Sequence, residues 1–158
     1  MTPRPSWLLC AVSAIVLAGC GNSGDSTAPA SDYVSESGAP VSVAQVFGET
    51  APGGKDFRTF VSVERDGRSV VERGPIEPLL GDVPDPLFHV GLVPGSYTVE
   101  ISQHVCDSSG CGAEPSGPAW IQCSGDFEAE GEKPVDIVAF VDTFSKSCEI
   151  KTGFVELG

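Results

Sequence analysis

Most of this chain alternates apolar and polar residues with a period of two, which is the pattern of β-strands that bury one face. In residues 96–102, for example, Tyr97, Val99 and Ile101 alternate with polar neighbours. After residue 19, no ten-residue window repeats apolar residues at helical spacing without an interrupting Pro or Gly. The expected strands are residues 41–47, 57–65, 69–73, 87–90, 96–102, 119–127, 135–141 and 148–155.

Short strands at this spacing predict an all-β fold, because a parallel sheet would need helices to cross between its strands. We expect a single antiparallel β-sandwich of about seven strands. Asp66-Gly67 lies between two β-rich runs and predicts a tight hairpin. Residues 74–86 contain four prolines, which cannot donate ladder hydrogen bonds, so we expect a crossover loop there.

The run GLVPGSYTV at residues 91–99 combines a turn signal with the start of an apolar strand face. Pro94-Gly95 suits a type II turn, and Tyr97 begins the apolar face. The run resembles a motif of transthyretin-like sandwiches, which include carboxypeptidase regulatory-like and Cna B-type domains. The resemblance implies a sandwich whose tyrosine enters the core, and a binding or spacer role in place of catalysis.

The first residues differ in kind from the rest of the chain. Residues 7–17, WLLCAVSAIVL, form an apolar run that follows Arg4, the one charged residue before Asp25. As a helix this run would rise about 16 Å, half of a membrane's hydrocarbon core. We therefore expect a secretory signal segment and not a membrane span.

Leu17-Ala18-Gly19-Cys20 follows this run directly, and its small residues allow close approach of a peptidase. The stretch resembles the lipobox of bacterial lipoproteins. The resemblance implies diacylglyceryl transfer to the Cys20 sulfur, cleavage between Gly19 and Cys20, and acylation of the new amino terminus. The alternative is an ordinary secretory signal, with Cys20 left free or in a disulfide.

These features divide the chain into three expected parts. Residues 1–19 form a lipoprotein signal peptide with a helical apolar segment. Residues 20–40 hold the lipidated Cys20 and a disordered linker, because this stretch is rich in Gly, Ser, Thr, Ala and Pro and has almost nothing to bury. Residues 41–158 form a disulfide-stabilised β-sandwich domain.

Charge narrows the choice of partners. The chain has 22 acidic and 9 basic residues, a formal net charge of −13. Cleavage after Gly19 removes Arg4, which leaves 8 basic residues and a charge of −14. We expect no nucleic-acid partner and no direct docking on anionic lipid. The expected membrane contact is the lipid on Cys20, at the extracytoplasmic face of the bacterial cell membrane.

Four further cysteines follow Cys20: Cys106, Cys111, Cys123 and Cys148. In an exported domain they predict two disulfides, for which three pairings exist. Cys106 and Cys111 bracket a turn sequence and rank first as a local pair, which leaves Cys123 with Cys148. The outer strands of a three-stranded meander would lie about 10 Å apart, beyond disulfide reach. This pairing therefore predicts that the two strands face each other across the core.

Other roles for these cysteines fit less well. The C-x4-C spacing of Cys106 and Cys111 is not the C-x-x-C of a thiol oxidoreductase. A zinc site would need paired C-x2-C knuckles, which this sequence does not contain. Structural disulfides are the preferred interpretation.

Candidate chemistry is sparse. His89 and His104 are the two histidines, and neither lies in a recognised nucleophile or metal motif. Alternation from Thr98 onward places His104 on the solvent face, and His89 in a short strand suits a structural role. A two-histidine metal site is the less favoured alternative. We therefore expect no enzyme, no catalytic or metal-binding residues and no cofactor.

Acidic residues raise the question of calcium. Residues 126–132 hold four carboxylates and residues 82–85 hold two more. Calcium needs several oxygens that converge on one point. Alternation instead places Asp126, Glu128 and Glu130 in a row on one strand face, which is typical of a solvated face.

Two functions remain from these features. The preferred one is a lipid-anchored extracytoplasmic sandwich that serves as a non-catalytic binding or structural module of the cell envelope, with a protein or envelope partner of unknown identity. The alternative is a ligand or metal carrier that uses the acidic face and loops 74–86 and 107–118, with Trp120 at the rim.

Overall fold

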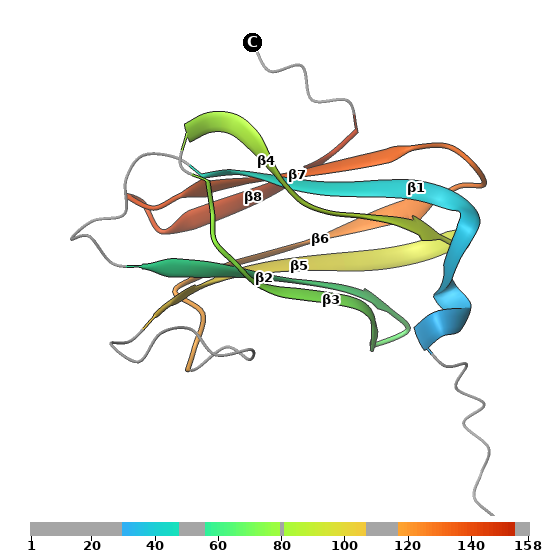
Figure 1. The fold of residues 1–158 in the computed structure, drawn as a ribbon, viewed down its shortest axis with the longest axis horizontal. Coiled ribbons are helices and arrows are strands. Elements are labelled where there is room, and N and C mark those ends of the chain that lie inside the picture. The colour runs from blue at the N-terminus through green and yellow to red at the C-terminus, as the bar shows by residue number, and fades with distance from the viewer. Residues whose placement is uncertain (1–29, 48–55, 80, 107–116, 154–158) are drawn as a thin grey trace, which may run out of the picture.

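The fold is a sandwich of two β-sheets, each with four strands, in a computed structural model that describes residues 30–47, 56–79, 81–106 and 117–153 (Figure 1). Sheet A has the strand order β4-β1-β7-β8, and sheet B has the order β3-β2-β5-β6. Within these residues, no helix is long and apolar enough to cross a membrane. The elements are η1 (Ala30–Tyr33), β1 (Val34–Phe47), β2 (Phe57–Arg65), β3 (Arg68–Ile76), β4 (Gly81–Leu92), β5 (Gly95–Val105), β6 (Ile121–Ala129), β7 (Val135–Asp142) and β8 (Ser147–Thr152).

The all-β sandwich expected from the alternation is confirmed, and one pairing differs from expectation. β1 and β7 pair in parallel, with Val41 opposite Val135 and Phe47 opposite Val141. The other strand pairs are antiparallel. A parallel neighbour arises because the chain leaves sheet A after β1, re-enters it as the antiparallel strand β4, and returns from β5 and β6 of sheet B as β7 in the direction of β1.

The folded part begins earlier than the linker expected over residues 20–40. η1 starts at Ala30, and Ala39 has no exposed surface. Val34 and Ala39 both lie opposite Leu92, so the residues between them bulge out of the ladder. A Cβ atom at Gly38 would overlap the Leu92 backbone. The stretch that composition assigned to a linker therefore contains a glycine needed for close strand packing. The signal peptide and Cys20 lie outside the described residues.

The crossover loop expected over residues 74–86 is much shorter than predicted. β3 continues to Ile76, and β4 begins at Gly81, so that both Pro84 and Pro86 lie within a strand. This is possible because β3 and β4 are edge strands, each with one side that needs no ladder partner. Proline was a correct sign of unpaired backbone, but the unpaired backbone belongs to a sheet edge.

The predicted hairpin at Asp66-Gly67 is confirmed. Asp66 and Gly67 have φ values of 54° and 72°, as a type I′ turn requires at both central positions, and they join β2 to β3. By contrast, residues 93–94 carry the chain from β4 in sheet A to β5 in sheet B. Gly95 has a φ of 153°, far from the about 80° of a type II turn, so that turn prediction is wrong.

Two apolar clusters fill the space between the sheets. The larger one contains Tyr97, which is buried as the sequence motif implied. The smaller one consists of Phe47, Phe57, Ile121 and Val141. It lies at the end of the sandwich where β1 and β7 finish and β4 begins, which we call the far end. The opposite end of the sandwich contains η1, the β2–β3 turn and the β6–β7 turn, and we call it the η1 end.

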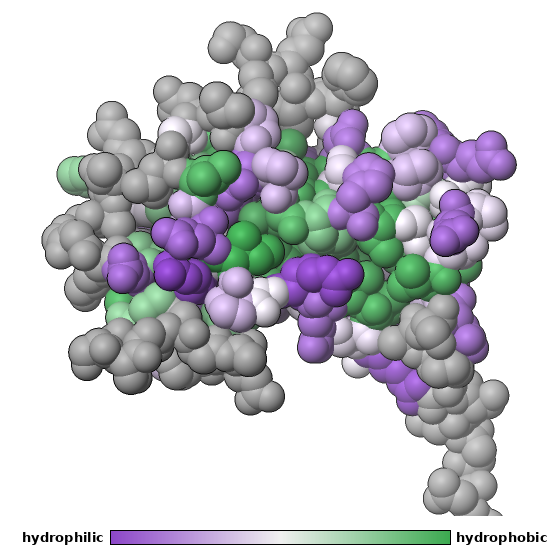
Figure 2. All heavy atoms as spheres, in the orientation of Figure 1, coloured by the Kyte–Doolittle hydropathy of each residue, from purple (hydrophilic) through white to green (hydrophobic). Residues whose placement is uncertain are grey.

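The two long edges of the sandwich are closed differently. Along one edge β6 lies against β8, where Gly125 leaves room for the Ile150 side chain. Along the other edge β3 and β4 have few contacts with each other. Figure 2 shows a band of apolar side chains between the two sheets, with polar side chains above and below it.

Candidate functional site

The structure joins Cys123 to Cys148 in a disulfide, with their Cα atoms 5.4 Å apart. Cys123 lies in β6 of sheet B and Cys148 in β8 of sheet A, so the bond links the two sheets. This confirms the pairing, and also the expectation that these strands face each other. The bond covalently closes the β6–β8 edge.

The remaining cysteines of the sequence analysis lie at the limits of the described chain. Cys106, which follows β5, is also disulfide-bonded. Cys111, its expected partner, and Cys20, the expected lipid attachment site, lie outside the described residues. The Cys106–Cys111 pairing and the lipidation therefore stay predictions.

A buried polar layer separates the two apolar clusters, and the sequence analysis did not identify it. In sheet A, Gln45 of β1 lies opposite Asp85 of β4. In sheet B, Thr59 of β2 lies opposite Gln103 of β5. All four side chains are buried, so two polar cross-strand pairs face each other across the sandwich.

Hydrogen bonds connect this layer from one sheet to the other. Gln103 donates from Nε2 to Gln45 Oε1 over 2.9 Å, and Gln45 donates from Nε2 to Asp85 Oδ2 over 3.2 Å. The Thr59 hydroxyl lies 3.1 Å from Gln45 Oε1 and 3.0 Å from Gln103 Oε1, and can donate its one proton to either. Because unsatisfied buried polar groups are costly, these partners fix how the sheets align at this level.

A sequence signal for the polar layer exists. Gln45 continues the alternation of Val41 and Val43, and Gln103 continues that of Val99 and Ile101. A polar residue at a core-facing position in several strands indicates a buried network, since a single one would have no partner. Asp85 belongs to the acidic segment 82–85 that raises the question of calcium, but its carboxylate accepts a hydrogen bond from Gln45 within this layer.

His104 is buried, so the expectation that it faces solvent is wrong. Its exposed fraction is 6%, and its ring meets Phe60 edge-on at 5.3 Å. Nε2 lies 3.2 Å from the Ser102 hydroxyl, whereas Nδ1 makes no regular hydrogen bond with a described residue. Burial lowers the pKa of His104, and the Gly117 backbone opposes this weakly. Alternation assigned the correct face of β5, but it did not show that this face is covered.

His89 lies far from His104 in the fold. It is exposed on edge strand β4 of sheet A, opposite Ser42, whereas His104 belongs to sheet B. The structure therefore does not bring the two histidines together. Among the residues described, no group of three or more His, Cys, Asp or Glu side chains is arranged to hold a metal ion.

The acidic row on β6 is solvent-facing, as alternation predicted: Asp126, Glu128 and Glu130 are exposed. Two of its carboxylates are held by hydroxyls of the neighbouring strand β5. Thr98 donates to Asp126 Oδ1 over 2.7 Å, and Ser96 donates to Glu128 Oε1 over 2.5 Å. These bonds direct the carboxylates along the sheet instead of toward one common point.

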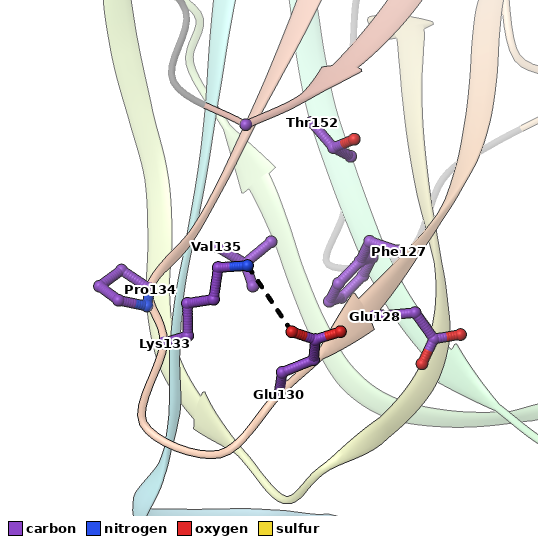
Figure 3. A pocket seen from close by; sticks show the side chains of 8 residues that line it. Phe127, Glu128, Glu130, Lys133, Pro134, Val135 and Thr152 are labelled. Carbon is purple, nitrogen blue, oxygen red and sulfur yellow. Dashed lines mark ion pairs between the residues drawn. The ribbon is translucent and has the colours of Figure 1, made fainter.

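A shallow hollow lies beside this row at the η1 end, with a volume of about 280 Å³ (Figure 3). Phe127 and Val135 supply apolar surface, and Thr152 lines it from β8. Lys133 and Glu130 form an ion pair of 3.6 Å at its rim, and both are exposed. An exposed pair of this kind contributes little stability.

Arg65 ties η1 to the body of the sandwich. Its guanidinium lies 4.9 Å from the ring centre of Tyr33 and 5.3 Å from that of Tyr97. It also donates to the Pro94 carbonyl and to the Tyr97 hydroxyl, both over 3.1 Å. The Tyr97 hydroxyl in turn donates to the Val93 carbonyl over 2.7 Å. This cluster fixes the point at which the chain enters the domain.

Trp120, expected at a rim, lies at the far end and is half-buried. Its ring packs on Phe57 with 4.7 Å between centres, and Lys146 Nζ lies 5.5 Å from it. Of the carrier loops, residues 107–116 lie outside the described chain, and residues 74–86 are mostly strand.

Comparisons with known proteins add no relative. No family model matches the chain, and neither a curated protein nor a solved structure is significantly similar to it.

Proposed function

We propose that this chain is a lipid-anchored extracytoplasmic β-sandwich that acts as a non-catalytic binding or structural module of a bacterial cell envelope. The observation that carries the proposal is the disulfide between the two sheets. Structural disulfides form and persist in oxidising compartments and are rare in the cytosol. A bond that joins Cys123 to Cys148 across the sandwich therefore supports export.

The lipobox at Leu17–Cys20 supplies the proposed anchor. η1 begins at Ala30, so ten residue steps separate Cys20 from the folded domain. Ten steps span at most about 36 Å. The start of η1 therefore lies within about 36 Å of the proposed lipid attachment at Cys20.

Two further observations support a role without catalysis or nucleic acid. Ser102 and His104 lie in contact, but their exposed fractions are 8% and 6%, so a substrate has no access to them. The net charge of −13 opposes binding to nucleic acid and to anionic lipid surfaces. The membrane is then reached through the lipid on Cys20, and the binding partner is a component of the envelope.

Mass spectrometry of the protein purified from its native membrane tests the anchor. We expect the first residue to be Cys20, with a mass increase that matches a diacylglyceryl group and a further acyl chain. The Cys20→Ser variant should lose this increase and leave the membrane fraction. A mature protein that begins elsewhere and has an unmodified Cys20 would falsify the assignment.

A further inference from the structure

His104 is buried although it lies on the outer face of a sheet. Its neighbour in β5, Gln103, points between the two sheets and bonds to Gln45, so the His104 ring points away from the core. The ring is nevertheless part of a residue that is only 6% exposed. Other parts of the chain must therefore lie over this position from outside the sandwich.

Residues 117–120, which lead into β6, form part of that cover. The Trp120 N–H donates to the Gln103 carbonyl over 2.8 Å, which holds the segment beside the end of β5. The Gly117 backbone lies close enough to the His104 ring to offset part of the effect of burial on its pKa. The segment thus runs across the outer face of sheet B at the level of His104.

The contacts of the ring suit a neutral imidazole. Nε2 of His104 lies 3.2 Å from the Ser102 hydroxyl, whereas Nδ1 makes no regular hydrogen bond with a described residue. The Phe60 ring meets the imidazole edge-on at 5.3 Å. A protonated imidazole has two N–H donors and a charge, and burying it without a partner at each donor is costly. Burial therefore lowers the pKa of His104.

Charged neighbours do not offset this cost. The described charged residues that flank the site are two of each sign: Asp56, Arg58, Glu77 and Lys146. Arg58 lies directly opposite His104 in β2, and Glu77 lies 3.8 Å from its guanidinium. On β5, Glu100 is four residues or about 13 Å away on the same face, beyond the Debye length of about 8–10 Å. Removal of the ring from water therefore decides its charge.

The segment over the ring can yield more easily than the strands beside it. β2 and β5 are the two central strands of sheet B, and each is paired on both sides. Residues 117–119 lie outside the sheets, and Gly117 and Pro118 are exposed. Among the described residues, the backbone hydrogen bond that ties this segment to β5 is the one from Trp120 to Gln103. A charged ring therefore regains water at the lowest cost when this segment lifts.

We propose that His104 is a pH-sensitive latch. Its neutral ring keeps residues 117–120 on the outer face of sheet B, and its protonation releases them while the sandwich stays folded. The Cys123–Cys148 bond and the larger apolar cluster lie between the sheets, so release does not require them to open. In an exported protein the latch would respond directly to the acidity of the surroundings. The inference concerns the folded domain and does not depend on the lipid.

Hydrogen exchange of single backbone amides, followed by NMR, tests the latch. The Trp120 amide reports release, and the Ile101 amide, opposite Val61 and Cys123 in the centre of sheet B, reports global unfolding. Exchange is measured at pH 7.5 and pH 5.0 and expressed as a protection factor, which removes the intrinsic effect of pH on exchange. For a histidine that titrates near 6.5 when released, opening increases up to about thirtyfold over this range. We expect the Trp120 protection factor to fall at least about tenfold.

Urea separates local release from global unfolding. Lifting a short segment exposes little surface, so low concentrations of urea should leave the exchange of the Trp120 amide unchanged. Exchange of the Ile101 amide should become faster with urea, because it requires the sandwich to unfold.

Variants assign the effect to one histidine. His104→Phe keeps an aromatic ring against Phe60 but cannot be protonated, so the fall in the Trp120 protection factor should shrink below about twofold. His104→Gln tests the same point if the first variant does not fold. His89→Gln, at an exposed position of β4, should keep the full fall.

Three results would overturn the inference. The first is a Trp120 protection factor that does not change between the two pH values. The second is a fall that persists in a folded His104 variant. The third is exchange of the Trp120 amide that rises with urea as steeply as that of the Ile101 amide, which would show global unfolding in place of local release.

Discussion

Gln45, Thr59 and Gln103 show what a single position in an alternating strand does and does not reveal. Each continues an apolar face, and each is buried as that face requires. Their side chains are nevertheless polar, and they are stable there because they bond to one another across the two sheets. Alternation along a strand thus predicts which side chains are buried. The hydrogen-bond partner that stabilises a buried amide lies on a distant strand, and alternation does not predict it.

His104 leads to a prediction about pH at the residue scale. Its pKa is lowered by burial, so the unfolded chain takes up a proton at a higher pH than the folded chain does. Stability is therefore full above the unfolded value near 6.5 and falls as the pH drops below it, by at most about 1.4 kcal/mol per pH unit. Urea unfolding at pH 7.5 and 5.5 measures this loss. We expect His104→Phe to reduce it, since the ring that contacts Phe60 remains but no longer titrates.

His89 provides the matched control for this measurement. It is exposed on β4, so His89→Gln should leave the pH dependence of the wild-type protein unchanged. An equal loss of stability with falling pH in His104→Phe and in the wild type would show that His104 does not cause it.

At the scale of elements, glycine and proline alone do not mark where strands begin and end. Pro84 and Pro86 were interpreted as a loop, yet they lie in β4, because an edge strand leaves one side of its backbone unpaired. The stretch with Gly38 was interpreted as a linker, yet it lies in β1 and packs against Leu92. In both cases local composition does not distinguish a loop from a strand, and only the neighbouring strand does.

The close approach at Gly38 gives a prediction for this element. A Cβ atom there would overlap the Leu92 backbone, so Gly38→Ala should destabilise the protein by about 1–3 kcal/mol, in the range of overpacking. Ser37→Ala, at the exposed neighbouring position, should stay within about 0.5 kcal/mol. Chemical denaturation measures both. The backbone amides that pair β1 with β4 near Leu92 should also exchange hydrogen faster in Gly38→Ala. Unchanged stability in that variant would contradict the close packing of Gly38 against Leu92.

At the scale of the whole molecule, the two edges of the sandwich have different strength. The β6–β8 edge carries the Cys123–Cys148 bond and the contact of Gly125 with Ile150, whereas β3 and β4 meet weakly. The buried polar layer and the Arg65 cluster add non-covalent links between distant segments. Opening of the sandwich should therefore begin at the β3–β4 edge.

Removal of the inter-sheet disulfide tests this division. The residues it joins are 25 apart, for which loop entropy predicts about 3.5 kcal/mol of stabilisation. We expect the double variant Cys123→Ser/Cys148→Ser to lose stability of that order in denaturant. Asp126→Asn, on the exposed face of β6, should change it by less than about 0.5 kcal/mol. A double variant as stable as the wild type would show that the bond does not support the fold.

The candidate functional site, like the strands, is predictable from the sequence only in part. Sequence ranked the Cys123–Cys148 pair correctly, because Cys106 and Cys111 bracket a turn sequence and leave these two cysteines to each other. It also placed the row of Asp126, Glu128 and Glu130 on a solvated face. It did not identify the hydrogen bond from the Leu79 N–H to Asp85, because that bond depends on where a buried carboxylate meets the backbone six residues away.

The sequence by itself determined the all-β class, the Asp66-Gly67 hairpin and the face of most strand residues, because alternation and turn chemistry act between near neighbours. The tertiary structure decided the parallel β1–β7 pair, the polar layer and the cover over His104. Each of these depends on which distant strands become neighbours. That choice is made by packing of the whole sandwich, and short-range patterns carry no record of it.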